Sequence, residues 1–320
     1  MSSIPARPAP PPGWWSRSTP IAIPCGRPIV QNIHSLQFLG ADTRHGDPHS
    51  ARYLVLPIPY EGGVSYGTGT AAAPEAVLRS SAYLELYDEV VDDEPSRHGI
   101  VTLAPLSVEG DHETVHRSIY EQCKTIFNRN TFPCIIGGDH SISNPVFGAL
   151  QELYPTLSCV QIDAHADLRD HYDGSRFSHA SVMARIRELT PDVLQIGIRS
   201  MSREEAELIK QEHLAVCTMY GFRGGGYDWR AALASLPDPL YLSFDVDAMD
   251  WSVIASTGTP EPGGLSWDEA MVLLHAIFSE KTVVGCDIVE LAASPTDRNS
   301  AFAVAKLLYK MIGLHAATFT

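Results

Sequence analysis

The chain has 320 residues, of which 44% are hydrophobic and 19% are charged. This composition is that of an ordinary globular protein, and it excludes a collagen-like fibre, a long coiled coil and a largely disordered chain. Lys and Arg total 23 against 38 Asp and Glu, which gives a formal net charge of −15. Because a chain this acidic repels the phosphate backbone of nucleic acids, we expect no nucleic-acid partner. Its negative charge instead favours the binding of small cations and metal ions.

Hydropathy and cysteine usage predict the cellular location of the protein. No apolar run reaches the roughly 18 residues that span a bilayer, so we expect no membrane partner. None of the 6 Cys forms a C-x-x-C pair. Because no signal-peptide pattern precedes them, we expect reduced thiols and a cytoplasmic protein.

The first 30 residues differ from the rest of the chain. Pro10, Pro11 and Pro12 exclude a helix and favour an extended polyproline form. We therefore expect a Pro-rich N-terminal arm over residues 1–30, disordered or clasping a partner, followed by a single catalytic domain over residues 31–320.

From Tyr53 onward, short apolar runs alternate with segments of helical periodicity. The predicted strands are, in chain order, residues 53–59, 134–138, 158–165, 193–198, 214–219, 240–247 and 283–291. The predicted helices begin at Pro74 and then cover residues 112–127, 143–153, 179–189, 202–211, 266–278 and 299–312. Because strands and helices alternate and several strands are apolar on both faces, the sequence predicts an α/β fold with a mostly parallel central sheet.

Polar clusters follow four of these strands at the point where each strand ends. They are residues 139–141, 163–167, 245–247 and 287–290. In open α/β sheets, ligands bind beyond the carboxyl ends of the strands. Because strand side chains alternate, Asp163, His165 and Asp167 would share one face if the strand geometry persists, and Asp245 and Asp247 would form a second such pair.

With His140, these clusters supply four carboxylates and two imidazoles. Carboxylates raise each other's pKa when they are grouped, and divalent ions remove that cost. Oxygen donors mixed with some nitrogen fit Mn²⁺, and also Ni²⁺, Co²⁺ or Zn²⁺. Two neighbouring ions can hold a hydroxide as a nucleophile near neutral pH. Each cluster alone has an ordinary explanation as a helix cap or a surface acid, but their occurrence in order favours a metal site.

Several motifs together resemble one known family. They are GGDHS (137–141), DAHADL (163–168), SHAS (178–181), SFDVDAMD (243–250), TGTPEPGGLS (257–266) and DIVEL (287–291). The chain resembles the ureohydrolases, which include arginases and agmatinases, from about residue 53 to residue 314, and residues 60–90 are similar to bacterial agmatinases. The resemblance implies a three-layer α/β/α fold and a centre of two Mn²⁺, with Ni²⁺ as the alternative. It also implies release of urea from a guanidinium and assembly into homotrimers or hexamers.

The resemblance further implies roles for individual residues. The metal ligands would be His140, Asp163, His165, Asp167, Asp245 and Asp247, with Asp163 bridging the two ions. Asp167 would also accept a hydrogen bond from the hydroxide, Glu290 would bind the guanidinium, and His179 would carry a proton to the leaving amine. Tyr66 and Thr259 would contact the substrate. The ordinary alternatives are a helix-start role for His179 and an ion pair with an Arg for Glu290.

The substrate is predicted from departures from the arginase pattern. Residues 169–177 lack the Asn- and Ser-bearing loop by which arginases hold the amino-acid carboxylate, so we expect agmatine, cleaved to putrescine and urea. Asp170 and Asp173 would favour an amine on the substrate tail. Trp251 stands where the family usually has Pro. It would either contact a smaller substrate in a shortened pocket or pack outward against a neighbouring subunit.

Three alternatives stay open at the level of the sequence. Within the enzyme class, the substrate could be guanidinobutyrate or free guanidine. The chain could also be a non-catalytic metal-binding homologue, which His179 and Glu290 disfavour because metal binding alone does not need them. A deacetylase-like enzyme with a single zinc ion would leave His140 and Asp247 without a role.

Overall fold

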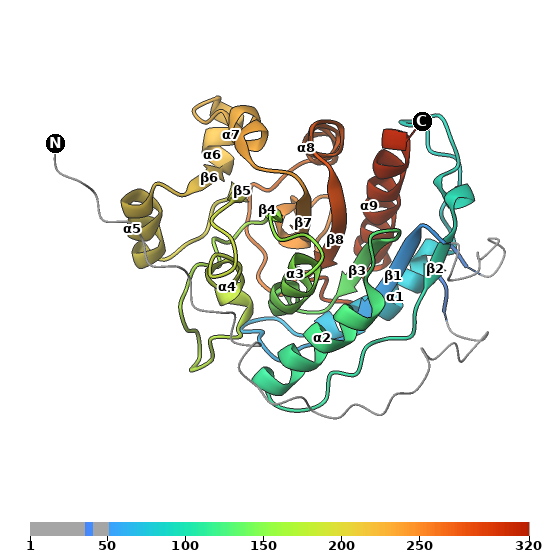
Figure 1. Ribbon diagram of the computed structural model, residues 1–320, viewed down its shortest axis with the longest axis horizontal. Helices are drawn as coiled ribbons and strands as arrows, with labels where there is room; N and C mark the ends of the chain where they lie inside the picture. Colours follow the sequence, from blue (N-terminus) through green and yellow to red (C-terminus); the bar gives the residue numbers. More distant parts are fainter. Residues whose placement is uncertain (1–35, 41–50, 320) are drawn as a thin grey trace.

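The structure is a computed structural model that describes residues 36–40 and 51–319. The Pro-rich arm predicted for residues 1–30 lies outside the described residues. Eight strands form one parallel sheet in the order β2–β1–β3–β8–β7–β4–β5–β6 (Figure 1). Their bounds are β1 Tyr53–Ile58, β2 Ile100–Thr102, β3 Phe132–Gly137, β4 Ser158–Ile162, β5 Val193–Ile198, β6 Ala215–Thr218, β7 Leu240–Asp245 and β8 Val283–Val289.

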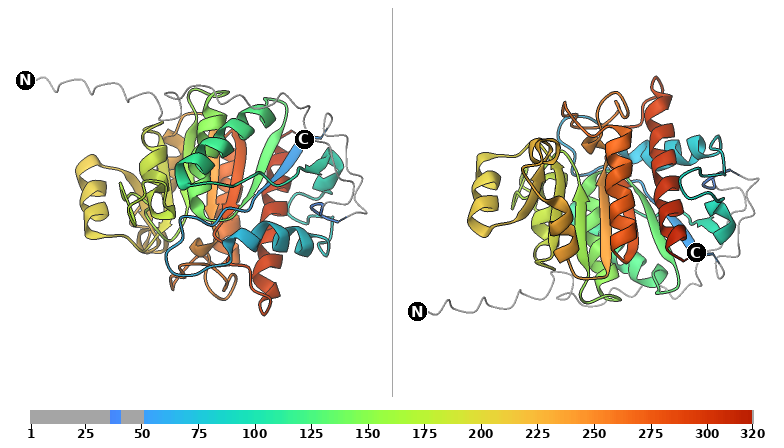
Figure 2. Two further views of the ribbon diagram at one scale, coloured as in Figure 1. Left: turned by 90° about the horizontal axis from the view of Figure 1, so that it is seen from below. Right: turned by 90° about the horizontal axis from the view of Figure 1, so that it is seen from above.

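Helices cover both faces of this sheet. Their bounds are α1 Ala73–Ser81, α2 His112–Ile126, α3 Ser143–Gln151, α4 Val182–Ile186, α5 Arg203–Glu212, α6 Met219–Gly224, α7 Trp229–Ser235, α8 Trp267–Glu280 and α9 Arg298–Ala316. One apolar core joins the sheet to α1 and α6–α9, and a second core joins the opposite face to α2–α5. Figure 2 shows the two faces, with α2 and α3 over one and α8 and α9 over the other. The predicted three-layer α/β/α fold is confirmed.

Local sequence explains where several of these helices begin. Ser202 and Ser266 each form a capping box with the Glu three residues later, and so begin α5 and α8. The Asp111 carboxylate accepts a hydrogen bond from the backbone N of Thr114 at the start of α2. These caps fall within one residue of the predicted helix starts, because the side-chain signal and the apolar periodicity coincide there.

The structure corrects the predicted elements in four places. Strand β2 was missed, because its 3 residues at the sheet edge are too few to show a pattern. Helices α6 and α7 were also missed, because they flank a Gly-rich turn. The strand predicted over residues 158–165 ends at Ile162. The helix predicted over residues 179–189 is a 3₁₀ turn, His179–Ser181, followed by the short α4.

The strand order places four strand ends side by side at the centre of the sheet. Strands β3, β8, β7 and β4 are neighbours, although up to 150 residues separate them in the chain. The chain runs outward from β4 to β6 and then returns to the middle for β7 and β8. A crevice at such a reversal of strand order is where α/β proteins bind ligands. Within residues 36–40 and 51–319, every helix is too short or too polar to traverse a bilayer.

Candidate active site

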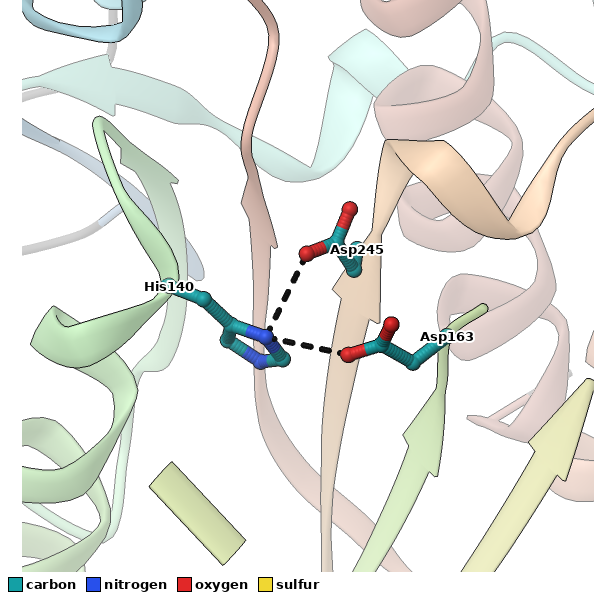
Figure 3. Close-up of side chains that lie close together, drawn as sticks. All are labelled: His140, Asp163 and Asp245. Atoms are coloured by element: carbon teal, nitrogen blue, oxygen red, sulfur yellow. Dashed lines mark ion pairs between the residues drawn. The ribbon is translucent and has the colours of Figure 1, made fainter. Parts of the chain in front are cut away.

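His140 reaches the site from a tight turn after β3. It begins a 3₁₀ helix, His140–Ile142, which Asp139 caps by accepting a hydrogen bond from the backbone N of Ser141 at 3.0 Å. Gly138 is required here, because a Cβ at this position would overlap the backbone oxygen of Tyr60. The capping interpretation therefore applies to Asp139, while the buried His140 ring turns toward the acids of the neighbouring strand ends (Figure 3).

The acids after β4 converge through a turn rather than along a strand. The backbone N of His165 donates to Asp163 Oδ1 at 2.6 Å, and Asp167 has a left-handed backbone with φ of 52°. The geometric premise that an extended strand aligns the three side chains is therefore wrong. The turn nevertheless buries Asp163 and Asp167 beside His140 and leaves the His165 side chain partly exposed.

Strand β7 completes the cluster. Asp245 ends the strand, and its carboxylate accepts a hydrogen bond from the backbone N of Asp247, which lies in the 3₁₀ helix Val246–Ala248. His140 with Asp163 and Asp245 forms one group suited to a metal ion, and Asp163 with His165 and Asp247 forms a second. The two groups share Asp163. The structure thus brings together all six side chains that the sequence proposed as metal ligands.

The distances around His140 Nδ1 suit donors to a divalent ion. His140 Nδ1 lies 3.1 Å from Asp163 Oδ2, 3.1 Å from Asp167 Oδ2 and 3.3 Å from Asp245 Oδ2. Nevertheless, this buried nitrogen has no hydrogen-bond partner of acceptable geometry. Ligand atoms about 2.0–2.2 Å from one ion lie about 3 Å from each other, so this spacing fits donors that surround a divalent ion.

Charge in the cluster is also unbalanced without a cation. Burial and the neighbouring Asp163 raise the pKa of Asp167 to about 7. Burial and the other carboxylates likewise raise the pKa of Asp245 and of Asp247. Burial alone would lower the pKa of His165, but Asp247 and Asp163 raise it to about 12. The raised pKa values of Asp167, Asp245 and Asp247 favour their protonated forms, and the residues present fit a divalent ion that would replace those protons.

Glu290 and His179 lie beside this cluster. Glu290 follows β8 with a left-handed backbone, φ 66°, and its buried Oε1 accepts a hydrogen bond from the backbone N of His140 at 2.7 Å. Burial and the neighbouring Asp139 raise the pKa of Glu290 well above its usual range. His179 Nδ1 lies 3.9 Å from Glu290 Oε1, and burial lowers the pKa of His179. Among the residues that the structure describes, Glu290 forms no ion pair with an Arg, whereas His179 does begin a 3₁₀ turn and has its ring directed at the Glu290 carboxylate.

The other predicted contacts lie farther out. Thr259 Oγ1 is 3.5 Å from Asp247 Oδ2, at the edge of the cluster. Tyr66 is 83% exposed and Trp251 is 50% exposed, so neither fills an enclosed pocket in the single chain. Asp170 pairs with Arg185 at 2.6 Å, so its charge is already balanced within the protein.

Sequence reasoning missed four side chains that support the cluster. Gln161 Nε2 donates to Asp163 Oδ2 at 2.5 Å, and Glu261 Oε1 lies 3.9 Å from His165 Nε2. Ser243 Oγ lies 2.9 Å from His140 Nε2 and donates a hydrogen bond to Asp287 Oδ1 at 2.8 Å. The period-two alternation that aligns residues 243 and 245 could have indicated Ser243. Asp287 was predicted to follow a strand but lies within β8, and its place behind His140 depends on the pairing of β7 with β8.

Comparison with known proteins identifies the family of the chain. Residues 51–313 match the model of the arginase family. The chain is 38% identical to the N(1)-aminopropylagmatine ureohydrolase of Synechocystis sp. over 287 residues, which cover 87% of this chain and 93% of that relative. It is 34% identical to the agmatinase of Pyrococcus horikoshii, with 84% and 94% covered.

A solved structure shows the same fold. The agmatine ureohydrolase of Thermoplasma volcanium superposes with a TM-score of 0.80 at 28% identity, covering 90% of this chain and 97% of that structure. The chain therefore belongs to the arginase family, the ureohydrolases. It is a hydrolase of amidino C–N bonds, which sets aside the deacetylase-like and non-catalytic alternatives.

Proposed function

We propose that the protein hydrolyses the guanidinium group of agmatine or of an agmatine-like amine and releases urea, using two divalent metal ions. The observation that carries this proposal is that two ligand groups share Asp163, and that Glu290 accepts a hydrogen bond from the backbone N of His140, a member of the first group. A carboxylate shared by two groups suits a pair of ions, and a buried carboxylate next to them suits a planar cation.

The ligands divide between two ions. His140, Asp163, Asp167 and Asp245 would hold one ion, and Asp163, His165 and Asp247 would hold the other. Their oxygen-rich donor set favours Mn²⁺, with Ni²⁺ as the alternative. When bound, the pair of ions supplies a hydroxide near neutral pH. Asp167 accepts a hydrogen bond from this nucleophile.

Glu290 binds the guanidinium of the substrate. Because burial raises the pKa of this carboxyl, an incoming cation restores its ionised form and gains charge-assisted hydrogen bonds, two of them if the pairing is bidentate. This contact holds the central carbon of the guanidinium next to the metal ligands and lowers the entropic part of the barrier.

His179 carries the proton that the leaving amine requires. Burial lowers the pKa of His179 and favours the neutral imidazole, so the ring would take up a proton from solvent and pass it on to the nitrogen of the leaving amine. Its Nε2 lies 3.1 Å from Ser65 Oγ, and its Nδ1 faces Glu290. The ring thus lies between the guanidinium site and the outside.

Replacing His179 tests this role. We expect His179→Ala to lower turnover by about two to four orders of magnitude. Its metal content should equal that of the wild type, because the ring contacts no member of either ligand group. Retained turnover in the variant, measured as urea released per bound metal, would contradict the role.

Two substrates are favoured by specific observations. Agmatine is supported by the absence of a carboxylate-binding loop in residues 169–177. N(1)-aminopropylagmatine is supported by the 38% identical relative that carries this substrate in its name, and by the open surroundings of Tyr66 and Trp251, which leave room for a longer tail. Glu261, partly exposed beside His165, supplies negative charge that attracts an amine and repels a carboxylate.

A comparison of kcat/KM across guanidines tests the proposal. Metal-assayed protein is given agmatine, N(1)-aminopropylagmatine, guanidinobutyrate, arginine and guanidine, and urea is measured. We expect one of the two amines to be the best substrate. The two carboxylate-bearing compounds should be at least about 100-fold poorer, because like charges oppose each other at the site. No urea from any compound, in protein that holds two ions per chain, would overturn the proposal.

Two further proposals concern the whole chain. We propose assembly into homotrimers or hexamers, which light scattering of the purified protein would measure. We also propose that residues 31–320 form one catalytic domain, which limited proteolysis would test by yielding a single resistant fragment. Trp251, half exposed in the single chain, could then contact either the substrate tail or a neighbouring subunit.

A further inference from the structure

A buried carboxylate lies behind the site without contacting it. Asp287, in the middle of β8, has no exposed surface and accepts three hydrogen bonds. The donors are Tyr241 Oη at 2.6 Å, Ser243 Oγ at 2.8 Å and the backbone N of Phe244 at 3.2 Å. Because burying a carboxylate is costly, an acid held by three donors in the core needs a reason beyond packing.

Hydrogen-bond direction connects this acid to His140. Ser243 has one hydroxyl proton, and Asp287 Oδ1 at 2.8 Å is a nearer and stronger acceptor than Ser143 Oγ at 3.5 Å. The Ser243 oxygen is therefore left to accept, and the atom facing it at 2.9 Å is His140 Nε2. Nε2 must carry a proton in either charge state of the ring. When the ring is neutral, Nδ1 holds the free lone pair.

That lone pair points at the metal ligands. The same β7 strand carries Tyr241, Ser243 and Asp245 at alternate positions, and Ser243 lies opposite Asp287 in the register of β7 with β8. The alternation thus places three groups on one face of β7. The Tyr241 hydroxyl donates to Asp287, the Ser243 hydroxyl joins Asp287 to His140, and the Asp245 carboxylate lies near His140 Nδ1. His140 is held between the relay on Nε2 and the three carboxylate oxygens around Nδ1.

We propose that Asp287 is a positioning residue for the metal centre: through Ser243 it fixes the tautomer and the orientation of His140, and Tyr241 holds Asp287 in place. This inference rests on the proposed function, because it gives His140 the role of a ligand. A carboxylate behind a ligating imidazole raises the donor strength of the ring and keeps it aligned with the ion.

The test measures metal affinity in the full-length protein. Wild type and variants are stripped with a chelator and titrated with Mn²⁺ against a competing indicator, which yields a dissociation constant for each ion. We expect Ser243→Ala and Asp287→Asn each to weaken the binding of one of the two Mn²⁺ ions by about 10- to 100-fold. Tyr241→Phe should also weaken Mn²⁺ binding, but by a smaller factor. Ser243→Thr, which keeps the hydroxyl, should recover the wild-type value to within about threefold.

A matched control separates the relay from general loosening of the core. Tyr53→Phe also removes a buried hydroxyl from a strand of the sheet, β1, where it contacts His315 Nδ1 at 3.0 Å. We expect this control to leave both Mn²⁺ constants unchanged. Equal weakening in Tyr53→Phe and Tyr241→Phe would overturn the proposal.

Three other outcomes have fixed meanings. Wild-type affinity in Ser243→Ala or Asp287→Asn, or a Ser243→Thr variant as weak as Ser243→Ala, would also overturn the relay. If Ser243→Ala does not fold, Asp287→Asn, which has nearly the same shape as the native residue, carries the test. A wild-type protein that binds fewer than two Mn²⁺ per chain would contradict the proposed function rather than the relay.

Discussion

Two buried charge clusters in this protein differ in the source of their cation. In the first, Lys310 of α9 contacts Asp88 at 2.8 Å and Glu89 at 2.8 Å, and both Lys310 and Asp88 are buried. The second is the active-site cluster, where four carboxylates surround two imidazoles. An ammonium pairs directly with the acids of the first cluster, whereas the groups that face the acids of the second cluster at short distance are imidazoles.

The difference separates a structural ion pair from a site that requires a ligand. A buried carboxylate that has its own cation contributes to a unique fold, and breaking the pair is costly. The grouped carboxylates of the second cluster instead favour the binding of protons, by Asp167, Asp245 and Asp247 and by the imidazole of His165, as their raised pKa values indicate. Such a group is ready to exchange these protons for divalent ions.

The largest expected effect comes from removing one carboxylate of the active-site cluster. Asp245→Asn should weaken Mn²⁺ binding by at least about 100-fold, because the change removes a ligand and not merely a group that supports one. The raised pKa keeps Asp245 protonated in the metal-free protein, and Asn resembles that form. Urea unfolding of the metal-free variant should therefore match the wild type within about 1 kcal/mol. A large loss of metal-free stability would contradict this contrast.

The same change from Asp to Asn in the other cluster should lower stability and leave metal binding intact. Asp88→Asn leaves Lys310 buried with only the exposed Glu89 as a partner, so we expect the free energy of unfolding to fall by about 3 kcal/mol. The Mn²⁺ dissociation constants should not change. Urea unfolding and metal titration, run in parallel on both variants, measure the contrast, and weakened Mn²⁺ binding in Asp88→Asn would count against it.

The smallest effect is the pH dependence of metal stabilisation. Between the unfolded pKa of about 3.9 and the folded pKa of about 7, Asp167 keeps a proton that the unfolded chain releases. The contribution of Asp167 to metal-free stability therefore falls as pH rises through this window. Bound Mn²⁺ replaces the proton, so the gain in Tm on adding Mn²⁺ should be larger at about pH 8 than at about pH 5.5, by about 2–4 °C.

This prediction has its own check within the molecule. The Asp88–Lys310 pair lies outside both metal-ligand groups, so Asp88→Asn should keep the wild-type pH dependence of the gain in Tm. Asp245→Asn, which loses a ligand, should show a much smaller gain at both pH values. An equal gain in wild type at the two pH values would show that protons and metal do not compete.

Sequence patterns predicted most of the elements and the members of the site. Seven of the eight strands were found because they are continuous apolar runs, and the six proposed ligands were found because polar clusters follow those runs. The family motifs then indicated Glu290 and His179. Strand β2 escaped because three residues at an edge carry too little pattern, and the short helices α6 and α7 escaped because they flank a Gly-rich turn.

The apolar periodicity of the chain thus predicted the fold class and the grouping of acids at strand ends, and the resemblance of its motifs indicated the family. Only the tertiary structure decides that β3, β8, β7 and β4 are neighbours, that Asp167 reaches the site through a left-handed turn, and that Asp287 stands behind His140. The physical reason is the distance along the chain over which each interaction acts. Apolar periodicity and capping act over a few residues, whereas strand pairing joins segments more than 100 residues apart and is set by the packing of the whole sheet.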